Sequence, residues 1–187
     1  MTEPLNTTPE LTPEVVSSLS GGLVPASTPG LQQMIDSALA SIRRICGWHV
    51  FPVVDETITV DAFGGELLRL PTMHVEEVSE VRVQGVVVES SDYGWSASGM
   101  LELYDGEFPS RFRSVQVTLR HGFDDASDIL RVVAEIVRRS VLAGTGGNVS
   151  VGGISVGAPS GGGAGGNVMP VATEWRVIDR YKLREWP

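Results

Sequence analysis

The sequence predicts an α+β fold, in which helices flank a small antiparallel β region. Apolar residues recur at helical spacing in residues 31–46 and again in residues 127–143, which predicts the two flanking helices. Between them, short β-branched runs alternate with Gly-containing turns, which predicts the strands. We therefore expect one globular body over residues 31–143. An extended N-terminal arm precedes it, and a Gly-rich tether and a short C-terminal helix follow it.

The first thirty residues have the composition of an extended arm. Residues 1–30 contain five of the eleven prolines, many Ser and Thr, and neither Lys nor Arg. A segment of this kind buries too little apolar surface to fold alone, so we expect it to become ordered only by contact. Val15, Val16 and Leu19 predict at most one short helical turn within it.

The first helix of the body is expected over about residues 29–46. Thr28 is a candidate N-cap, and Pro29 suits the first helical position because its missing N–H needs no partner there. Gly47 follows the last turn, where a left-handed residue commonly ends a helix. The apolar stripe of this helix consists of Leu31, Ile35, Ala38, Leu39, Ile42 and Ile45.

The middle of the body has the pattern of a compact antiparallel sheet or small barrel. Gln84-Gly85 separates two valine-rich runs, so a hairpin is expected there, and Ser98-Gly99 separates another short pair of strands. Val115–Leu119 alternates between apolar and polar residues. The other expected strand segments are Thr57–Val60, Leu67–Leu70, Val78–Val83, Val86–Val88, Tyr93–Trp95 and Leu101–Leu103.

The second helix of the body is expected over about residues 127–143. One face carries oppositely charged residues four positions apart, which predicts the ion pairs Arg131–Glu135 and Glu135–Arg139. The apolar stripe on the other face consists of Ile129, Val132, Val133, Ile136, Val137 and Val141.

Residues 144–166 are the expected tether between the body and the tail. Eleven of these 23 residues are Gly, a composition typical of flexible linkers. Within this segment, Ile154 and Val156 predict at most one short strand.

The last segment, residues 167–187, is expected to contain a short amphipathic helix. Trp175, Ile178 and Tyr181 recur three residues apart, and Trp186 follows near the end. Aromatic residues are frequent anchors of protein interfaces. We therefore expect these four residues to form a partner interface, at which the tail docks on another protein chain. The alternative is that the tail folds back onto its own body.

The sequence shows no pattern of a known catalytic, metal or cofactor site. The histidines His49, His74 and His121 fit no common metal-ligand spacing. The Gly-rich tether lacks the Lys-Ser or Lys-Thr pair of a phosphate-binding loop. The single cysteine, Cys46, ends an apolar helical stripe and is expected to be buried. We therefore expect a chain that is not an enzyme and carries no metal or cofactor.

The chain is acidic, with a net charge of -9 at pH 7. No cluster of Lys and Arg stands out that would neutralise phosphates, so tight binding of nucleic acid is not expected. The longest apolar runs are only a few residues, which predicts no membrane-spanning helix. Together these features indicate a soluble product made in the cytoplasm.

A series of short segments follows a recognisable order along the body. In the first, Ile42–Pro52, a helix ends in arginines and Cys-Gly-Trp-His precedes a proline. The later segments are Thr57–Asp61, Gly64-Gly65, Leu67–Pro71, Val78–Gly85, Asp92–Ser96, Gly99–Leu101, Val115–Phe123 and Glu174–Leu183. In this order they resemble the head-to-tail adaptor (head-tail connector) family of long-tailed bacteriophages, particularly those of actinobacterial hosts. The resemblance covers residues 28–143 well and residues 173–184 loosely.

The resemblance implies a structural virion protein with a helical body and an inserted β region. Such subunits assemble into a ring of about twelve copies beneath the portal, in the neck between capsid and tail. One side of the ring would bind the portal protein and the other a stopper (head-completion) protein. Genomic DNA would pass through the lumen without specific binding.

Three other functions remain open at this point. Another neck or tail completion protein, such as a stopper or a tail terminator, shares the structural role, and a mainly-β barrel would favour it. An enzyme of unrecognised type would have a deep pocket with converging polar groups. A soluble binding module would use the edge of the sheet.

Overall fold

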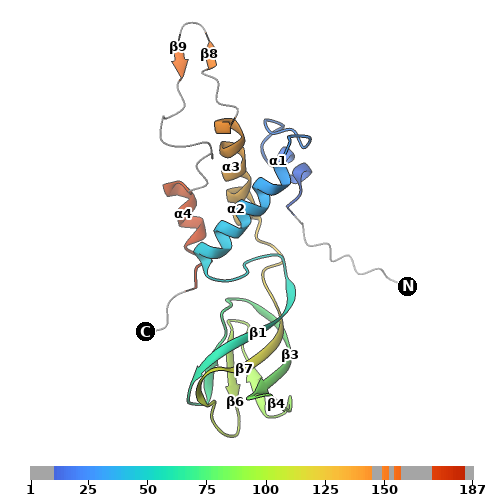
Figure 1. Cartoon of the computed structure of the whole chain (residues 1–187), viewed down its shortest axis with the longest axis vertical. Helices are drawn as coiled ribbons and strands as arrows, with labels where there is room; N and C mark the ends of the chain where they lie inside the picture. Colours follow the sequence, from blue (N-terminus) through green and yellow to red (C-terminus); the bar gives the residue numbers. More distant parts are fainter. Residues whose placement is uncertain (1–10, 145–148, 152–153, 157–169, 184–187) are drawn as a thin grey trace, which may run out of the picture. The chain divides into compact units, whose positions relative to one another are not determined.

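The chain forms two compact units, which we call the helical unit and the β unit. The structure is a computed structural model that describes residues 11–144, 149–151, 154–156 and 170–183 (Figure 1). Within these, the helical unit takes residues from 11–45 and 127–180, and the β unit takes residues 46–126 and 181–183. The predicted α+β class is confirmed, because helices and antiparallel sheets are both present. The body expected over residues 31–143 is divided between the two units.

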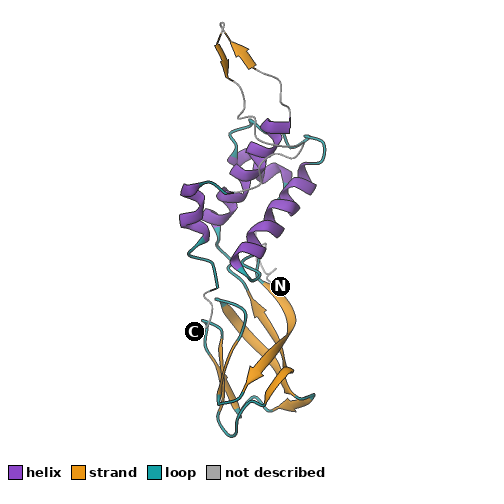
Figure 2. Ribbon diagram, turned by 60° about the vertical axis from the view of Figure 1, so that its left-hand side comes forward, coloured by secondary structure: helices purple, strands orange, loops and turns teal. Residues whose placement is uncertain are grey.

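The helices of the helical unit include both of those predicted from apolar spacing (Figure 2). They are α1 (Pro13–Leu19), α2 (Leu31–Cys46), α3 (Ser127–Gly144) and α4 (Ala172–Ile178). Ile35 and Ile42 of α2, like Ile129 and Ile136 of α3, are at most 1 % exposed. The predicted apolar stripe of α3 is therefore buried throughout, whereas in the stripe of α2 Leu39 and Ile45 are half-buried.

The start of α2 differs from the prediction, whereas its end agrees with it. The helix begins at Leu31. The Thr28 hydroxyl donates a hydrogen bond to the Pro25 carbonyl at 2.6 Å, and the Thr28 carbonyl accepts one from the Leu31 N–H at 3.2 Å. Gly30, with a φ of 73°, directly precedes the helix. Gly47 follows the last turn with a φ of 80°, the left-handed conformation expected of a helix C-terminus.

The ion pairs that the charged residues of α3 form differ from the two that the sequence predicted. Glu135 pairs with Arg138, three residues further on, at 2.8 Å. Arg139 pairs with Glu174 of α4. The partner of Arg139 thus lies 35 residues away in the sequence, because α4 packs against α3.

Residues 11–30 contain the short helix α1, where the sequence predicted a helical turn. The α1 helix begins with Thr12 as its N-cap, whose hydroxyl accepts a hydrogen bond from the Val15 N–H at 3.4 Å. Val16 is fully buried, and Leu11 and Val24 are buried on either side of the helix. The α3 helix, against which α1 packs, supplies the apolar surface that the composition of the arm lacks. Residues 1–10 of the expected arm lie outside the described residues.

Two antiparallel sheets form the β unit (Figure 1). The four-stranded sheet has the order β1-β7-β3-β4, and the three-stranded sheet has the order β2-β6-β5. The strands are β1 (Val54–Phe63), β2 (Leu67–Arg69), β3 (Val75–Val83), β4 (Val86–Val88), β5 (Tyr93–Trp95), β6 (Met100–Leu103) and β7 (Ser110–His121). Their order along the chain matches the order of the predicted strand segments.

Both predicted turns are present in the β unit. Gln84 and Gly85, with φ of 52° and 84°, join β3 to β4 in a two-residue hairpin. Gly99, with a φ of 85°, lies in the connection between β5 and β6. Side chains of both sheets then meet in one core, which includes Leu68 and Leu101 of the smaller sheet. The alternation predicted for Val115–Leu119 places its apolar residues in this core.

A short hairpin interrupts the expected tether. Its strands are β8 (Val149–Val151) and β9 (Ile154–Val156), which pair antiparallel with Val151 opposite Ile154. The sequence predicted at most one strand here. The rest of the Gly-rich segment lies outside the described residues.

Candidate partner-binding site

The four residues predicted as partner anchors are placed very differently from one another. Trp175 lies on α4 and is half-buried, whereas Ile178, the last residue of α4, is fully buried within the helical unit. Tyr181 lies beyond the end of the helix and belongs to the β unit. Trp186 lies outside the described residues. The expected helical face of three residues is therefore not formed, because the helix ends before Tyr181.

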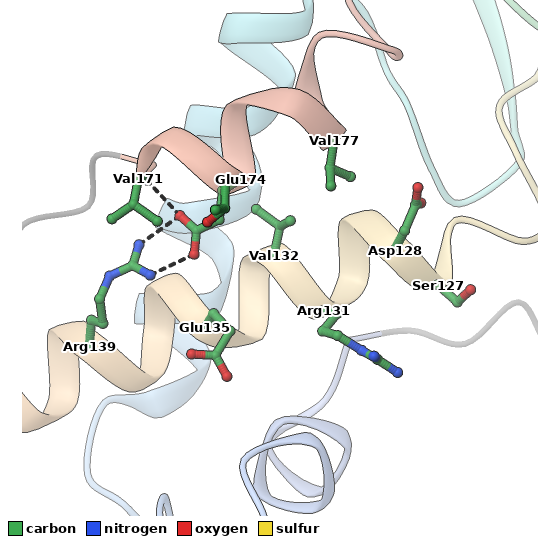
Figure 3. A pocket seen from close by; sticks show the side chains of 10 residues that line it. Ser127, Asp128, Arg131, Val132, Glu135, Arg139, Val171, Glu174 and Val177 are labelled. Atoms are coloured by element: carbon green, nitrogen blue, oxygen red, sulfur yellow. Dashed lines mark hydrogen bonds and ion pairs between the residues drawn. The ribbon is translucent and has the colours of Figure 1, made fainter.

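Glu174 is the residue that holds α4 on α3, and the sequence analysis did not single it out. Its two carboxylate oxygens accept hydrogen bonds from the Arg139 guanidinium at 2.5 and 2.9 Å (Figure 3). One of them also accepts from the Val171 N–H at 2.8 Å, at the start of α4. Glu174 is buried, and its hydrogen bonds to Arg139 raise the pKa of that guanidinium. At the other end of α4, Arg180 pairs with Asp128 at 3.0 Å.

A groove of about 560 Å³ lies along α3 and α4 (Figure 3). Its lining mixes apolar side chains, such as Val132 and Val177, with charged ones, such as Glu135 and Arg139. The carboxylates of Asp128 and Glu174 are both engaged by arginines. The groove therefore offers contact area and mixed charge, but no pair of groups arranged for acid–base chemistry.

Residues 181–183 are bound to the β unit by specific contacts. The Trp48 indole N–H donates a hydrogen bond to the Tyr181 carbonyl at 2.6 Å, and the Leu183 N–H donates to the Cys46 carbonyl at 2.9 Å. The Tyr181 ring packs edge-on against Phe123 with 5.5 Å between ring centroids. The described part of the tail thus folds back onto its own chain, which is the alternative that the sequence left open.

The three histidines lie in the β unit and have structural partners. His121 is buried, and its ring nitrogens lie 3.1 Å from the Thr72 hydroxyl and 3.2 Å from a Glu56 carboxylate oxygen. His49 bonds to the Pro52 carbonyl, and the ring of His74 stacks on an aromatic neighbour. Among the described residues, no group of three or more His, Cys, Asp and Glu is placed to hold a metal ion.

A pair of exposed aromatic rings on the β unit was missed in the sequence. Phe63 at the end of β1 is 76 % exposed and Phe112 in β7 is 72 % exposed, although their rings contact each other edge-on at 6.2 Å. Arg113 next to Phe112 has a φ of 53°, which is uncommon for a residue with a side chain. The available signal was a phenylalanine between two arginines, Arg111 and Arg113, within a strand pattern.

The two units differ in charge. Residues 46–126 contain fourteen Asp and Glu and five Arg, a net charge of -9. Residues 10–45 and 127–180 together contain seven Asp and Glu and seven Arg, which cancel. The acidity of the whole chain therefore resides in the β unit. In the part of the chain that the structure describes, no helix is long and apolar enough to cross a membrane.

No protein-family model matches the chain, and no curated protein matches it in sequence. Its fold is similar to two solved structures from GTA (gene transfer agent) particles. One is the neck of a native GTA particle computed with C12 symmetry, with a TM-score of 0.60 and 14% sequence identity. The other is the neck of an empty GTA particle computed with C6 symmetry, with a TM-score of 0.59 and 13% identity. Each match covers 100% of this chain and 95% of the other chain, so the fold is shared over the whole length.

Proposed function

We propose that the chain is a structural, non-enzymatic subunit of the neck of a phage-like particle. More specifically, we propose a head-to-tail adaptor that forms a ring beneath the portal and connects the capsid to the tail. The observation that carries this proposal is the fold shared between the whole of this chain and 95% of a chain from a GTA neck. The order of short sequence segments from Ile42–Pro52 to Glu174–Leu183 supports the same family independently.

The partners in this proposal are other copies of the chain, the portal protein and a stopper protein. A ring of about twelve copies is consistent with the C12 symmetry used for the neck of the native GTA particle. The two units divide the chain into two bodies of different charge, which suits a subunit that must contact more than one partner.

Genomic DNA is proposed to pass through the ring without specific binding. A lumen that holds DNA tightly would need cations to neutralise phosphates, whereas the β unit carries a net charge of -9. We expect the purified chain to bind duplex DNA no more tightly than ~10⁻⁴ M at physiological salt, the weak limit of non-specific binding. A micromolar complex that weakens steeply with salt contradicts this part of the proposal.

The C-terminal segment is proposed to contact the portal through its aromatic residues. Trp175 and Tyr181 are half-buried and keep part of their surface exposed. Ile178 is fully buried, so we propose that it supports α4 on its own chain rather than contacting the portal directly. We expect Trp175→Ala to reduce binding to purified portal rings while the circular dichroism spectrum is unchanged. Equal binding by the variant and the parent chain rejects Trp175 as an anchor.

The decisive test of the function locates the chain in particles. The source genome is used to produce particles in which this chain carries a small tag, and labelled particles are imaged by electron microscopy. We expect the label at the junction of capsid and tail, and a copy number per particle close to that of the portal protein. A label along the tail or inside the capsid, or no label on particles at all, contradicts the proposal. A label at the neck with half or fewer of the portal's copies rejects the adaptor ring specifically.

A further inference from the structure

Two exposed apolar patches lie toward opposite edges of the four-stranded sheet. The aromatic patch consists of Phe63 at the end of β1 and its contact partner Phe112 in β7. The valine patch consists of Val86, which is 70 % exposed, and Val87, both in β4. In the strand order β1-β7-β3-β4, β1 and β4 are the two edges (Figure 1). Exposed apolar surface of this kind commonly marks an interaction site.

The charges beside the two patches have opposite signs. Arg111 and Arg113 flank Phe112 in the sequence, and both are exposed. Neither forms an ion pair with another residue in the described parts of the chain. By contrast, residues 83–110, which include β4, hold five Asp and Glu and no Lys or Arg. Glu89 follows β4 directly and is exposed. The aromatic patch is therefore basic at its border. Beside the valine patch, Arg82, which lies opposite Val87 in β3, is paired with Glu80, and Glu89 adds a negative charge.

The backbone at the aromatic patch is held in an uncommon conformation. Arg113 has a positive φ, and its N–H donates a hydrogen bond to the Asp61 carboxylate at 2.7 Å across a register shift between β1 and β7. Such local strain is found frequently at functional positions. The irregularity interrupts the pairing of β1 with β7 directly beside Phe112.

We propose that the aromatic patch of one copy docks on the valine patch of a second copy of this chain. In this contact the two phenyl rings pack on Val86 and Val87, and the adjacent arginines approach Glu89. The contact joins two different surfaces of the chain. When two copies are joined, one copy therefore still has a free valine patch and the other a free aromatic patch, so further copies can add. Repetition of the same contact closes a ring if the rotation between neighbouring copies is suitable. The inference rests on the proposed ring function, and it assigns the surfaces through which neighbouring β units meet.

A second copy fits this surface better than a nucleic acid does. Arginine next to an aromatic ring also suits stacking on bases, but a strand of phosphates approaching the patch meets a unit with a net charge of -9. A second β unit instead offers the acidic and apolar surface that the aromatic patch lacks. Complementary charge of this kind fixes the orientation of two partners and disfavours wrong ones.

Photo-crosslinking of the full chain tests the contact. The photoreactive amino acid p-benzoylphenylalanine replaces Phe112, and the variant is mixed with isotope-labelled parent chain at high concentration. We expect cross-links between two chains that map by mass spectrometry to residues 84–92. The same amino acid in place of Tyr104, which is 60 % exposed on the same unit, is the matched control and should give no such link. Cross-links from position 112 that stay within one chain, fall elsewhere or do not form overturn the proposal.

Exchanging the charges of the two surfaces tests whether this contact is specific or is non-specific association. Arg111→Glu with Arg113→Glu should reduce the inter-chain cross-link about tenfold, and Glu89→Arg in the other chain should restore it. Failure of the exchange to restore the link overturns the assignment of Glu89. Duplex DNA in place of the second chain should give no link from position 112, and a DNA link there favours the nucleic acid. These readouts use the chain alone, so they fail or succeed independently of whether the label is found at the neck of particles.

Discussion

The β unit and the helical unit are built from the chain in opposite ways. Apart from residues 181–183, the described β unit comes from one continuous segment, residues 46–126. The helical unit is assembled from segments on both sides of it, and its α1 and α4 helices pack on α3 from distant parts of the sequence. The long-range pairings of the β unit, such as β1 with β7, thus lie within one continuous segment, whereas the helical unit depends on contacts between segments on both sides of that segment. The charge follows the same division, -9 against zero.

The largest expected loss of stability comes from a substitution in the core of the β unit, compared with one on its surface. Phe108 is buried between the sheets and Phe112 is largely exposed, so the two residues differ mainly in environment. We expect Phe108→Ala to lower the free energy of unfolding by about 3–5 kcal/mol, because the lost ring leaves a cavity. Phe112→Ala is the matched control and should change it by less than about 0.5 kcal/mol. Urea unfolding followed by circular dichroism measures both, and equal losses contradict the placement of the two rings.

The next effect tests whether α4 is part of the helical unit. Ile178 is fully buried, so Ile178→Ala should lower the free energy of unfolding by about 3 kcal/mol. Hydrogen exchange should show the loss of protection first in α4 and in the part of α3 that it covers. A variant as stable as the parent chain means that α4 detaches readily, as the sequence suggested for the tail.

The sequence predicted the elements that depend on near neighbours in the chain. The hairpin at Gln84-Gly85 and the apolar stripe of α3 were found because their signals are local. The burial of Val16 was not predicted, because its helix α1 packs against α3, more than a hundred residues further on. The contact of α4 with α3 was not predicted for the same reason, and the docking of the tail on a partner stays a prediction.

The positions of the expected anchor residues in the fold were only partly predicted from the sequence. Of the four expected anchors, Ile178 supports its own unit, and the exposed pair of Phe63 and Phe112 was not found. Apolar residues at strand positions indicate burial on average, and only the structure shows on which side of the sheet each one lies. The pairing of Arg139 with Glu174 was equally hidden, because both residues have oppositely charged neighbours closer in the sequence.

A smaller loss of stability is expected when an ion pair of the helical unit is broken, and an ion pair of the β unit provides the comparison. The Arg139–Glu174 pair is largely buried and joins two helices, so Glu174→Ala should lower the free energy of unfolding by about 2 kcal/mol. The Arg82–Glu80 pair of the β unit is exposed and lies within one strand. Glu80→Ala should therefore leave the unfolding midpoint unchanged. Raising the salt concentration should reduce this difference only slightly, because the buried pair is weakly screened. Equal effects of the two variants contradict the structural role of Glu174.

The smallest expected effect is an alkaline pH dependence that belongs to the β unit. Burial of Tyr93, with a smaller contribution from the negative charge of Glu80, raises the pKa of its phenol above 10. In the unfolded chain the phenol ionises near pH 10, whereas in the folded chain it stays neutral to higher pH. Its contribution to stability is therefore complete below about pH 10 and declines as the pH rises further.

Tyr93→Phe should remove the part of the alkaline loss of stability that comes from this phenol. Tyr104→Phe, at an exposed tyrosine of the same unit, should retain it. The measurement is the urea midpoint between neutral pH and about pH 11, where the parent chain and the Tyr104 variant should fall together. If the urea midpoint of the Tyr93→Phe variant falls as much as that of the parent chain, other groups cause the alkaline loss of stability, and the phenol of Tyr93 does not contribute to it.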